Sequence, residues 1–298
     1  MGASVSIRRL IVLVLALGCS VPVPALGEGS PSNTARESPA RATVENLIQQ
    51  SRANVSVAFR SLDGTSELFI QAGTPFEYPA AMKIPVMIEL YARVNARELR
   101  WDDTVPVHAT FRSVADGSTY DLDLAAAPKI FATAKTMTLR QLCDAMILRD
   151  SDLAANLLME KLGLDAIRQR IHALGPDGMD LVAGFGDSKA AVQGLKNVTT
   201  SRALMVILWS LANDQVVSAD DSKQMMGLMA RSGLQAIISG AAPMTRPAAR
   251  RPAGADHHEA TIIIGARSFV LVTDVRGLAD AQASALVARI AHAVSRAM

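Results

Sequence analysis

A single lysine, Lys83, lies near the start of an apolar stretch that reads PFEYPAAMKIPVMIEL from residue 75 to residue 90. A serine three residues before a lysine shares one helical face with it, so that the amine can take the hydroxyl proton while the oxygen attacks a carbonyl. Here Ala80 occupies that position, and no serine, threonine or cysteine lies between Phe76 and Lys83. A methyl group cannot attack a carbonyl, so the stretch has the outline of a nucleophilic site without its nucleophile.

A second polar stretch, RDSDL at residues 149–153, carries the carboxylates of Asp150 and Asp152. If these two side chains face Lys83, opposite charge within a few ångströms favours the protonated ammonium. A lysine held as a cation is a poor general base. The alternative interpretation is that both aspartates lie on a solvated loop and have no role.

Two further stretches offer polar side chains. In GFGDSKAAVQGLKNVTT (184–200), Asp187 is the only carboxylate and Asn197 could fix the conformation of the loop; we expect neither to be catalytic. In RPAARRP (246–252), Arg250 could attract an anionic ligand, or the whole stretch could be a solvated basic loop. The candidate ligand-binding residues are Lys83, Asp150, Asp152, Asn197 and Arg250, and the degenerate catalytic positions are Ala80, Lys83, Asp150 and Asp152.

Residues 256–259, with the sequence DHHE, are all of metal-ligand types. Adjacent side chains on a strand point to opposite faces, so one surface would present only alternate members of the run. We therefore expect no metal site and no cofactor.

The pattern of apolar residues and turn signals predicts the elements that must position these side chains. VSVAFRSL (55–62), Asp63-Gly64 and TSELFIQA (65–72) predict a hairpin. Thr138 and Gln141 form a capping-box pattern that starts a helix expected to run to Gly163. Further strands are expected at 260–264 and 269–275, and further helices at 44–52, 80–99, 164–174, 200–213, 218–232 and 278–297. Strands at both ends with helices between them predict an α+β fold with one antiparallel sheet.

Five strings in order carry a resemblance to a known family. They are MKIPVMIEL (82–90), FRSVADGSTYDLD (111–123), TLRQLCDAMIL with LAANLL (138–158), GLKNVTTSRALM (194–205), and HHEATIII with FVLVTDVRGL (257–278). Together they resemble the class A-like group of the serine β-lactamase and penicillin-binding superfamily. The resemblance implies a serine β-lactamase-like fold, with an antiparallel sheet packed against helices plus an all-helical subdomain. It implies β-lactam hydrolysis through an acyl-serine as the family activity.

Measured against this family, the chemistry-bearing motifs are altered. The family's Ser-Asp-Asn falls on Asp150-Ser151-Asp152, so that two aspartates replace the proton-relaying serine and the amide. The nucleophile is replaced by Ala80, or was deleted with one neighbour between Ala81 and Met82; the sequence leaves both histories open. Ala249-Arg250-Arg251 stand where Lys-Thr-Gly is expected, and Val192 and Gln193 stand nearest to the general-base glutamate.

The N-terminus and the composition indicate where the chain acts. A basic start, an apolar run and a small-residue site predict a signal peptide at 1–27, followed by a linker at 28–42 and one domain at 43–298. Cys19 follows LALG and could carry a lipid anchor. No later segment has 18 apolar residues in a row, so we expect a periplasmic or secreted protein without a transmembrane segment, and a monomer. A net charge of +2 with 19% charged residues argues against a nucleic-acid partner.

Together these losses predict a protein of the β-lactamase-like group that no longer performs acyl-serine chemistry. We expect it to act as a binding or scaffolding module for a small-molecule or cell-wall-related ligand. The alternatives are a residual or divergent hydrolase, and an envelope protein without a pocket ligand.

Overall fold

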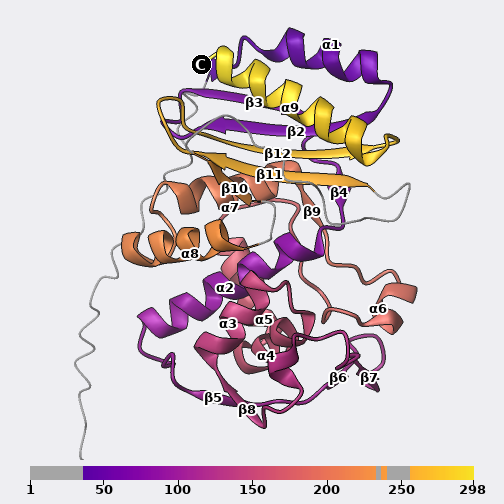
Figure 1. The fold of residues 1–298 in the computed structure, drawn as a ribbon, viewed down its shortest axis with the longest axis vertical. Coiled ribbons are helices and arrows are strands. Elements are labelled where there is room, and N and C mark those ends of the chain that lie inside the picture. The colour runs from indigo at the N-terminus through magenta and orange to yellow at the C-terminus, as the bar shows by residue number, and fades with distance from the viewer. Residues whose placement is uncertain (1–35, 233–235, 240–255) are drawn as a thin grey trace, which may run out of the picture. The chain divides into compact units, whose positions relative to one another are not determined.

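The computed structural model describes residues 36–232, 236–239 and 256–298 (Figure 1). The expected signal peptide, Cys19 and Arg250 lie outside the described residues.

The central element is a six-stranded sheet with the strand order β1-β3-β2-β12-β11-β10. Its four inner strands come from the two ends of the chain and pair antiparallel, as the sequence predicts. Each of the two edge strands pairs parallel with its neighbour. The strands are β1 (Arg36–Glu37), β2 (Asn54–Ser61), β3 (Ser66–Ile70), β10 (Ala236–Ser239), β11 (His257–Ile263) and β12 (Phe269–Arg276).

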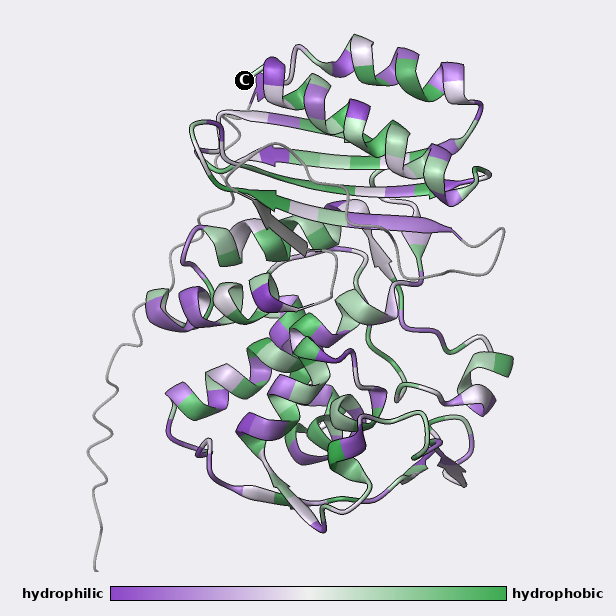
Figure 2. Cartoon of the chain, in the orientation of Figure 1, coloured by the Kyte–Doolittle hydropathy of each residue, from purple (hydrophilic) through white to green (hydrophobic). Residues whose placement is uncertain are grey.

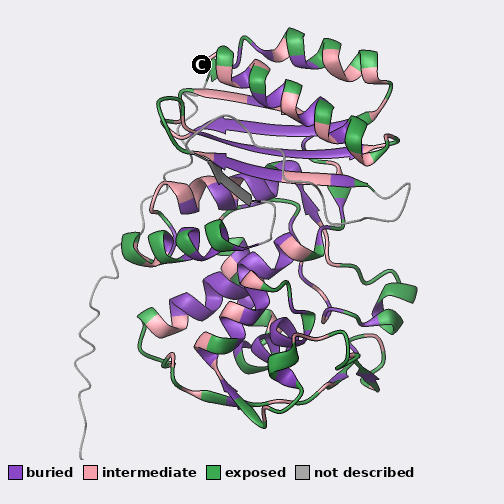
Figure 3. Ribbon diagram, viewed as in Figure 1, coloured by how far each residue is buried: buried purple, intermediate pink, exposed green. Residues whose placement is uncertain are grey.

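Helices cover both faces of this sheet (Figure 1). Helices α1 (Arg41–Ser51) and α9 (Asp280–Arg296) lie on one face, and α7 (Ser201–Ala212) packs against β2 and β12 on the other, next to α8 (Ala219–Arg231). Because side chains alternate along a strand, β12 sends Phe269 and Leu271 into the core under α1 and α9, and Val270 and Val272 into the other core. The sheet therefore buries apolar side chains on both faces; β2 and β12 are drawn mostly in the colour of buried residues (purple) in Figure 3, and Figure 2 shows hydrophobic residues (green) along them.

A second group of helices forms the all-helical part of the fold. It consists of α2 (Pro79–Asn95), α3 (Leu139–Leu148), α4 (Asp152–Leu162) and α5 (Leu164–Ala173), which contact one another around the largest core cluster. Short elements link this part to the sheet and border it: β4 (Pro75–Phe76), β5 (Thr104–Pro106), β6 (Thr110–Arg112), β7 (Thr119–Asp121), η1 (Lys129–Phe131), β8 (Thr136–Thr138), α6 (Ser188–Val192) and β9 (Thr199–Thr200).

Two boundaries differ from the sequence expectation. The single helix expected from Thr138 to Gly163 is two helices, because the chain turns at Asp150, whose φ of 53° is left-handed. The capping box at Thr138 and Gln141 is present and begins α3 as predicted. The expected linker to residue 42 is shorter among the described residues, since β1 already pairs with β3 and α1 begins at Arg41. None of the described helices is long and apolar enough to span a bilayer.

Candidate functional site

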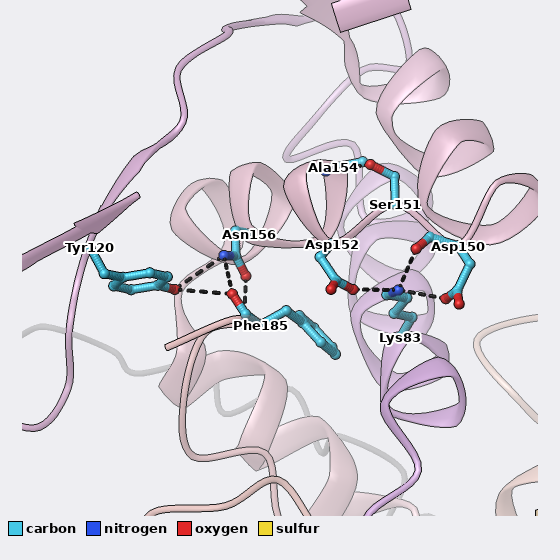
Figure 4. Close-up of polar contacts among 8 residues, drawn as sticks. All are labelled: Lys83, Tyr120, Asp150, Ser151, Asp152, Ala154, Asn156 and Phe185. Atoms are coloured by element: carbon cyan, nitrogen blue, oxygen red, sulfur yellow. Dashed lines mark hydrogen bonds and ion pairs between the residues drawn. The ribbon is translucent and has the colours of Figure 1, made fainter. Parts of the chain in front are cut away.

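Lys83 lies at the centre of the candidate site. Its side chain is 1% exposed, although it carries a charge, because α2 begins at Pro79 and places residue 83 in its buried first turns. The Nζ atom donates to the backbone oxygen of Asp150 at 2.8 Å and lies 2.5 Å from Asp150 Oδ1 and 2.7 Å from Asp152 Oδ1 (Figure 4). The two Asp150 oxygens accept hydrogen bonds from the ammonium group, and Asp152 Oδ1 adds an ion pair. The expectation that both aspartates face Lys83 agrees with this geometry.

The turn between α3 and α4 explains how two carboxylates reach one lysine. The left-handed backbone of Asp150 reverses the chain, and Ser151 then becomes the N-cap of α4, where its hydroxyl accepts from the backbone N–H of Ala154 at 3.2 Å. Ser151 is therefore buried and turned into the helix end, while the residues on either side of it point to Lys83 (Figure 4). The cap places Asp150 and Asp152 on the two sides of Ser151, and Leu153 belongs to the core.

Ala80 lies one helical turn before Lys83. Helix α2 runs without interruption from Pro79 to Asn95, so residues 80 and 83 share one face. Ala80 is half-buried and packs against the main core. The place one turn before the lysine is thus occupied by a methyl group.

Phe185 is the side chain that approaches Lys83 from the loop before α6. Its ring centroid lies 5.2 Å from Lys83 Nζ, within the range of a cation–π contact. Asn156 of α4 holds this position, because its amide accepts from the backbone N–H of Phe185 at 2.8 Å and donates to the carbonyl of Phe185 at 2.9 Å (Figure 4). The loop therefore presents an aromatic ring, and not a carboxylate, to the lysine.

Tyr120 closes the same arrangement from β7. Its hydroxyl accepts from Asn156 Nδ2 at 3.1 Å, and burial raises the pKa of the phenol, so it stays neutral. The backbone of residue 184 passes so close that a Cβ there would lie 2.1 Å from the Tyr120 oxygen. Only glycine fits at position 184, which explains one of the two glycines that flank Phe185.

The residues that the sequence placed nearest to a general base lie elsewhere. Val192 ends α6 and is 88% exposed, and Gln193 follows it as the C-cap. Asp187 is buried and engaged, since it caps α6 and accepts from Ser113 Oγ at 2.9 Å. The sequence places Val192 and Gln193 nearest to the family's general base. In the structure they lie at the exposed end of α6, and the side chain beside Lys83 is the ring of Phe185.

Asn197 fixes the conformation of the loop, which is one of the two roles expected from the sequence; the other is ligand binding. Its side-chain oxygen accepts from the backbone N–H groups of Val182 and Ala183, and its amide donates to the carbonyl of Ala183. Its role in ligand binding stays a prediction. Sequence reasoning missed Asn156 and Phe185; the available signals were an amide inside the apolar string LAANLL and an aromatic residue between two glycines.

A family model named Beta-lactamase2, described as the beta-lactamase enzyme family, matches residues 39–298. The chain belongs to the beta-lactamase enzyme family. No curated protein matches the chain.

Solved structures show the same β-lactamase fold at low sequence identity. The structure of PBP-A is 14% identical, with a TM-score of 0.67 over 88% of this chain and 97% of that one. A beta-lactamase from Chitinophaga pinensis is 17% identical, with a TM-score of 0.68 over 87% and 98%. A beta lactamase from Xanthomonas campestris pv. campestris is 16% identical, with a TM-score of 0.66 over 87% and 97%. The fold expectation, a sheet built from both chain ends packed on helices with an all-helical part, is confirmed.

Proposed function

We propose that this member of the β-lactamase family is a non-catalytic binding or scaffolding protein. The observation that carries the proposal is the ion-pair cluster in which Lys83 Nζ lies within 2.8 Å of three oxygen acceptors while Ala80 occupies the place one turn earlier.

Acyl-serine chemistry needs a lysine with a lone pair to take the proton of a nucleophile. Two carboxylates and a carbonyl stabilise the ammonium form of Lys83, in which no lone pair is available. The phenyl ring of Phe185 has no atom that could take a proton from an attacking water molecule. Groups that act together in catalysis lose most of the rate when one is removed, so several changes support a loss of turnover.

The charge of the cluster suggests the class of ligand. Asp150 and Asp152 are 59% and 49% exposed at their side chains, so each can meet a ligand while one oxygen remains on Lys83. Two carboxylates against one ammonium leave a net negative charge, which favours a small-molecule or cell-wall-related ligand with a cationic group. Asn197 and Arg250 remain candidate contributors to binding.

Turnover of a chromogenic cephalosporin and covalent labelling by a fluorescent penicillin test the proposal. We expect neither above the level of buffer for the purified protein. Turnover that disappears in Lys83→Ala or Asp150→Ala would show an active site and reject the proposal. Lys196→Ala, which removes an exposed ion pair with Glu77, is the matched control for loss of a lysine.

Thermal unfolding in the presence of ligands tests the charge argument. Because a ligand that binds the folded state raises the melting temperature, cationic amines should raise it more than millimolar penicillin. A clear rise with penicillin and none with amines would contradict the assignment of ligand charge while leaving the absence of turnover untouched.

A divergent hydrolase is the second candidate. The half-exposed carboxylates of Asp150 and Asp152 favour it, since water can reach them and a carboxylate can act as a general base. Cephalosporin turnover lost in both Asp150→Asn and Asp152→Asn would select this alternative. We further propose export to the periplasm or medium through residues 1–27, with a lipid anchor on Cys19, and a monomeric state.

A further inference from the structure

Three metal-ligand side chains meet where β11 starts and β12 ends. Asp256 and His258 are alternate residues, so they share one face at the start of β11, and His258 is the register partner of Asp274 on β12. One ligand atom from each residue lies within 4.8 Å of the others. The DHHE run alone could not supply three ligands to one face, but the neighbouring strand contributes the third.

Two buried atoms of this cluster are close together without a hydrogen bond. Asp274 is 2% exposed, and its Oδ1 lies 2.9 Å from His258 Nδ1, yet neither atom has hydrogen-bond geometry with any residue that the structure describes. The two atoms are in close contact, but they lack hydrogen-bond alignment, so neither has a directed partner among the described residues. A cation between them would accept electron density from both.

The surroundings hold these atoms in place. The His258 ring is stacked on Phe76 with centroids 4.8 Å apart. Arg276 Nε donates to Asp274 Oδ2 at 2.9 Å and lies 3.5 Å from Asp256 Oδ2, so the guanidinium engages the second oxygens and leaves Asp274 Oδ1 toward the histidine. Supporting contacts of this kind orient the ligands of metal sites. Two carboxylates against one guanidinium leave these acidic side chains with a net negative charge.

We propose that Asp256, His258 and Asp274 bind a divalent transition metal ion of the Zn²⁺ class. Imidazole nitrogen with carboxylate oxygen suits Zn²⁺ better than Ca²⁺ or Mg²⁺, which prefer oxygen ligands alone. Ligand atoms about 2.1 Å from one zinc ion lie roughly 3.0 to 3.4 Å apart at angles of roughly 90 to 109°, so the nitrogen and oxygen need only a small separation. This inference does not depend on the proposed function, and it reverses the expectation of no metal.

The test uses the full mature protein, purified without a histidine tag and freed of metal by dialysis against a chelator. Titration with ZnCl₂ followed by calorimetry should give one ion per chain, and Zn²⁺ should raise the melting temperature. Asp274→Asn and His258→Asn should each weaken Zn²⁺ binding at least about tenfold. Glu259→Gln, the neighbouring carboxylate on the opposite strand face, should leave binding unchanged.

The outcomes separate a metal site from a salt bridge. One zinc per chain that is lost in both variants, with millimolar Ca²⁺ failing to compete, supports the proposal. Absence of binding to the wild type, or equal binding by wild type and both variants, overturns it and leaves an ion pair between His258 and Asp274. If Asp274→Asn unfolds, Co²⁺ bound to the wild type and to His258→Asn decides the matter, because a nitrogen ligand alters its visible spectrum.

Discussion

At the scale of single residues, the exposure of the three partners decides how the Lys83 cluster behaves. The lysine is 1% exposed whereas the side chains of Asp150 and Asp152 are 59% and 49% exposed. An uncompensated charge is costly only where water cannot reach it. Losing both carboxylates should therefore destabilise the fold more than losing the lysine does, because water can solvate the carboxylates but not the buried ammonium.

This asymmetry predicts the stabilities of two variants. Replacing both aspartates in Asp150→Ala/Asp152→Ala leaves a buried ammonium and should lower the free energy of unfolding by about 3 kcal/mol. Lys83→Met, which keeps the apolar stem and frees carboxylates that water can solvate, should cost about 1 kcal/mol. Urea unfolding measures both values. Equal losses, or a larger loss for Lys83→Met, would show that burial does not govern the cluster.

Restoring the nucleophile alone should fail. In Ala80→Ser the new hydroxyl faces an ammonium that two carboxylates hold, so a fluorescent penicillin should not label the protein within hours. Ala80→Ser/Asp150→Ser/Asp152→Asn frees the amine and should label faster than the single variant. Rapid labelling of Ala80→Ser would contradict the role assigned to the ion pairs.

The sequence predicted this cluster better than it predicted the ring beside it. Asp150 and Asp152 follow from counting along a helix, because the strings on either side of them set the register. Phe185 does not follow, since its place depends on a loop whose path is set by two hydrogen bonds between Asn156 and the Phe185 backbone and by the close approach of Tyr120. Contacts between distant segments leave no periodic signal in a sequence.

At the scale of elements, the loop that carries Phe185 has one anchor in α4. Asn156 is 2% exposed and satisfies both the N–H and the carbonyl of Phe185. The break between α3 and α4 is instead set locally, by a left-handed aspartate and a serine cap. The sequence shows these residues but not the break, because a polar residue inside an amphipathic pattern also suits a continuous helix.

Removing the anchor should loosen the loop. Asn156→Ala leaves two buried backbone groups of Phe185 without their main partner, so the free energy of unfolding should fall by about 3 kcal/mol. Asn46→Ala on the exposed face of α1 is the control and should change it by about 0.5 kcal/mol or less. Limited proteolysis should cut between residues 176 and 198 in the first variant only. Resistance equal to that of the wild type would show that the loop is held by other contacts.

At the scale of the whole molecule, a buried thiol and a buried phenol limit the stability of the fold at alkaline pH. Burial raises the pKa of the Cys143 thiol from 9.0 to about 12, and the same cause raises the pKa of Tyr91 from 10.0 to about 12. Above pH 9 the unfolded chain loses protons that the folded chain keeps. The stability that these groups contribute is therefore complete below pH 9 and is lost as the pH rises toward 12.

Urea unfolding between pH 8 and 11 should show this loss. The neutral buried thiol contributes a slope of about 1.4 kcal/mol per pH unit between its two pKa values, and Tyr91 acts in the same direction at higher pH. Cys143→Ala should be less stable at pH 8 but should lose less stability as the pH rises. A slope unchanged by this substitution would exclude the thiol as the titrating group.

The pairing of β2 with β12 has a consequence for the order of folding. Residues 54–61 find their central neighbour only at residues 269–276, so the sheet cannot close until nearly the whole chain has left the ribosome. Contacts of such sequence separation make folding slow, and they keep the first hairpin incomplete in the meantime. A chain shortened before residue 257 should therefore remain sensitive to protease along its whole length, although every residue around Lys83 is present.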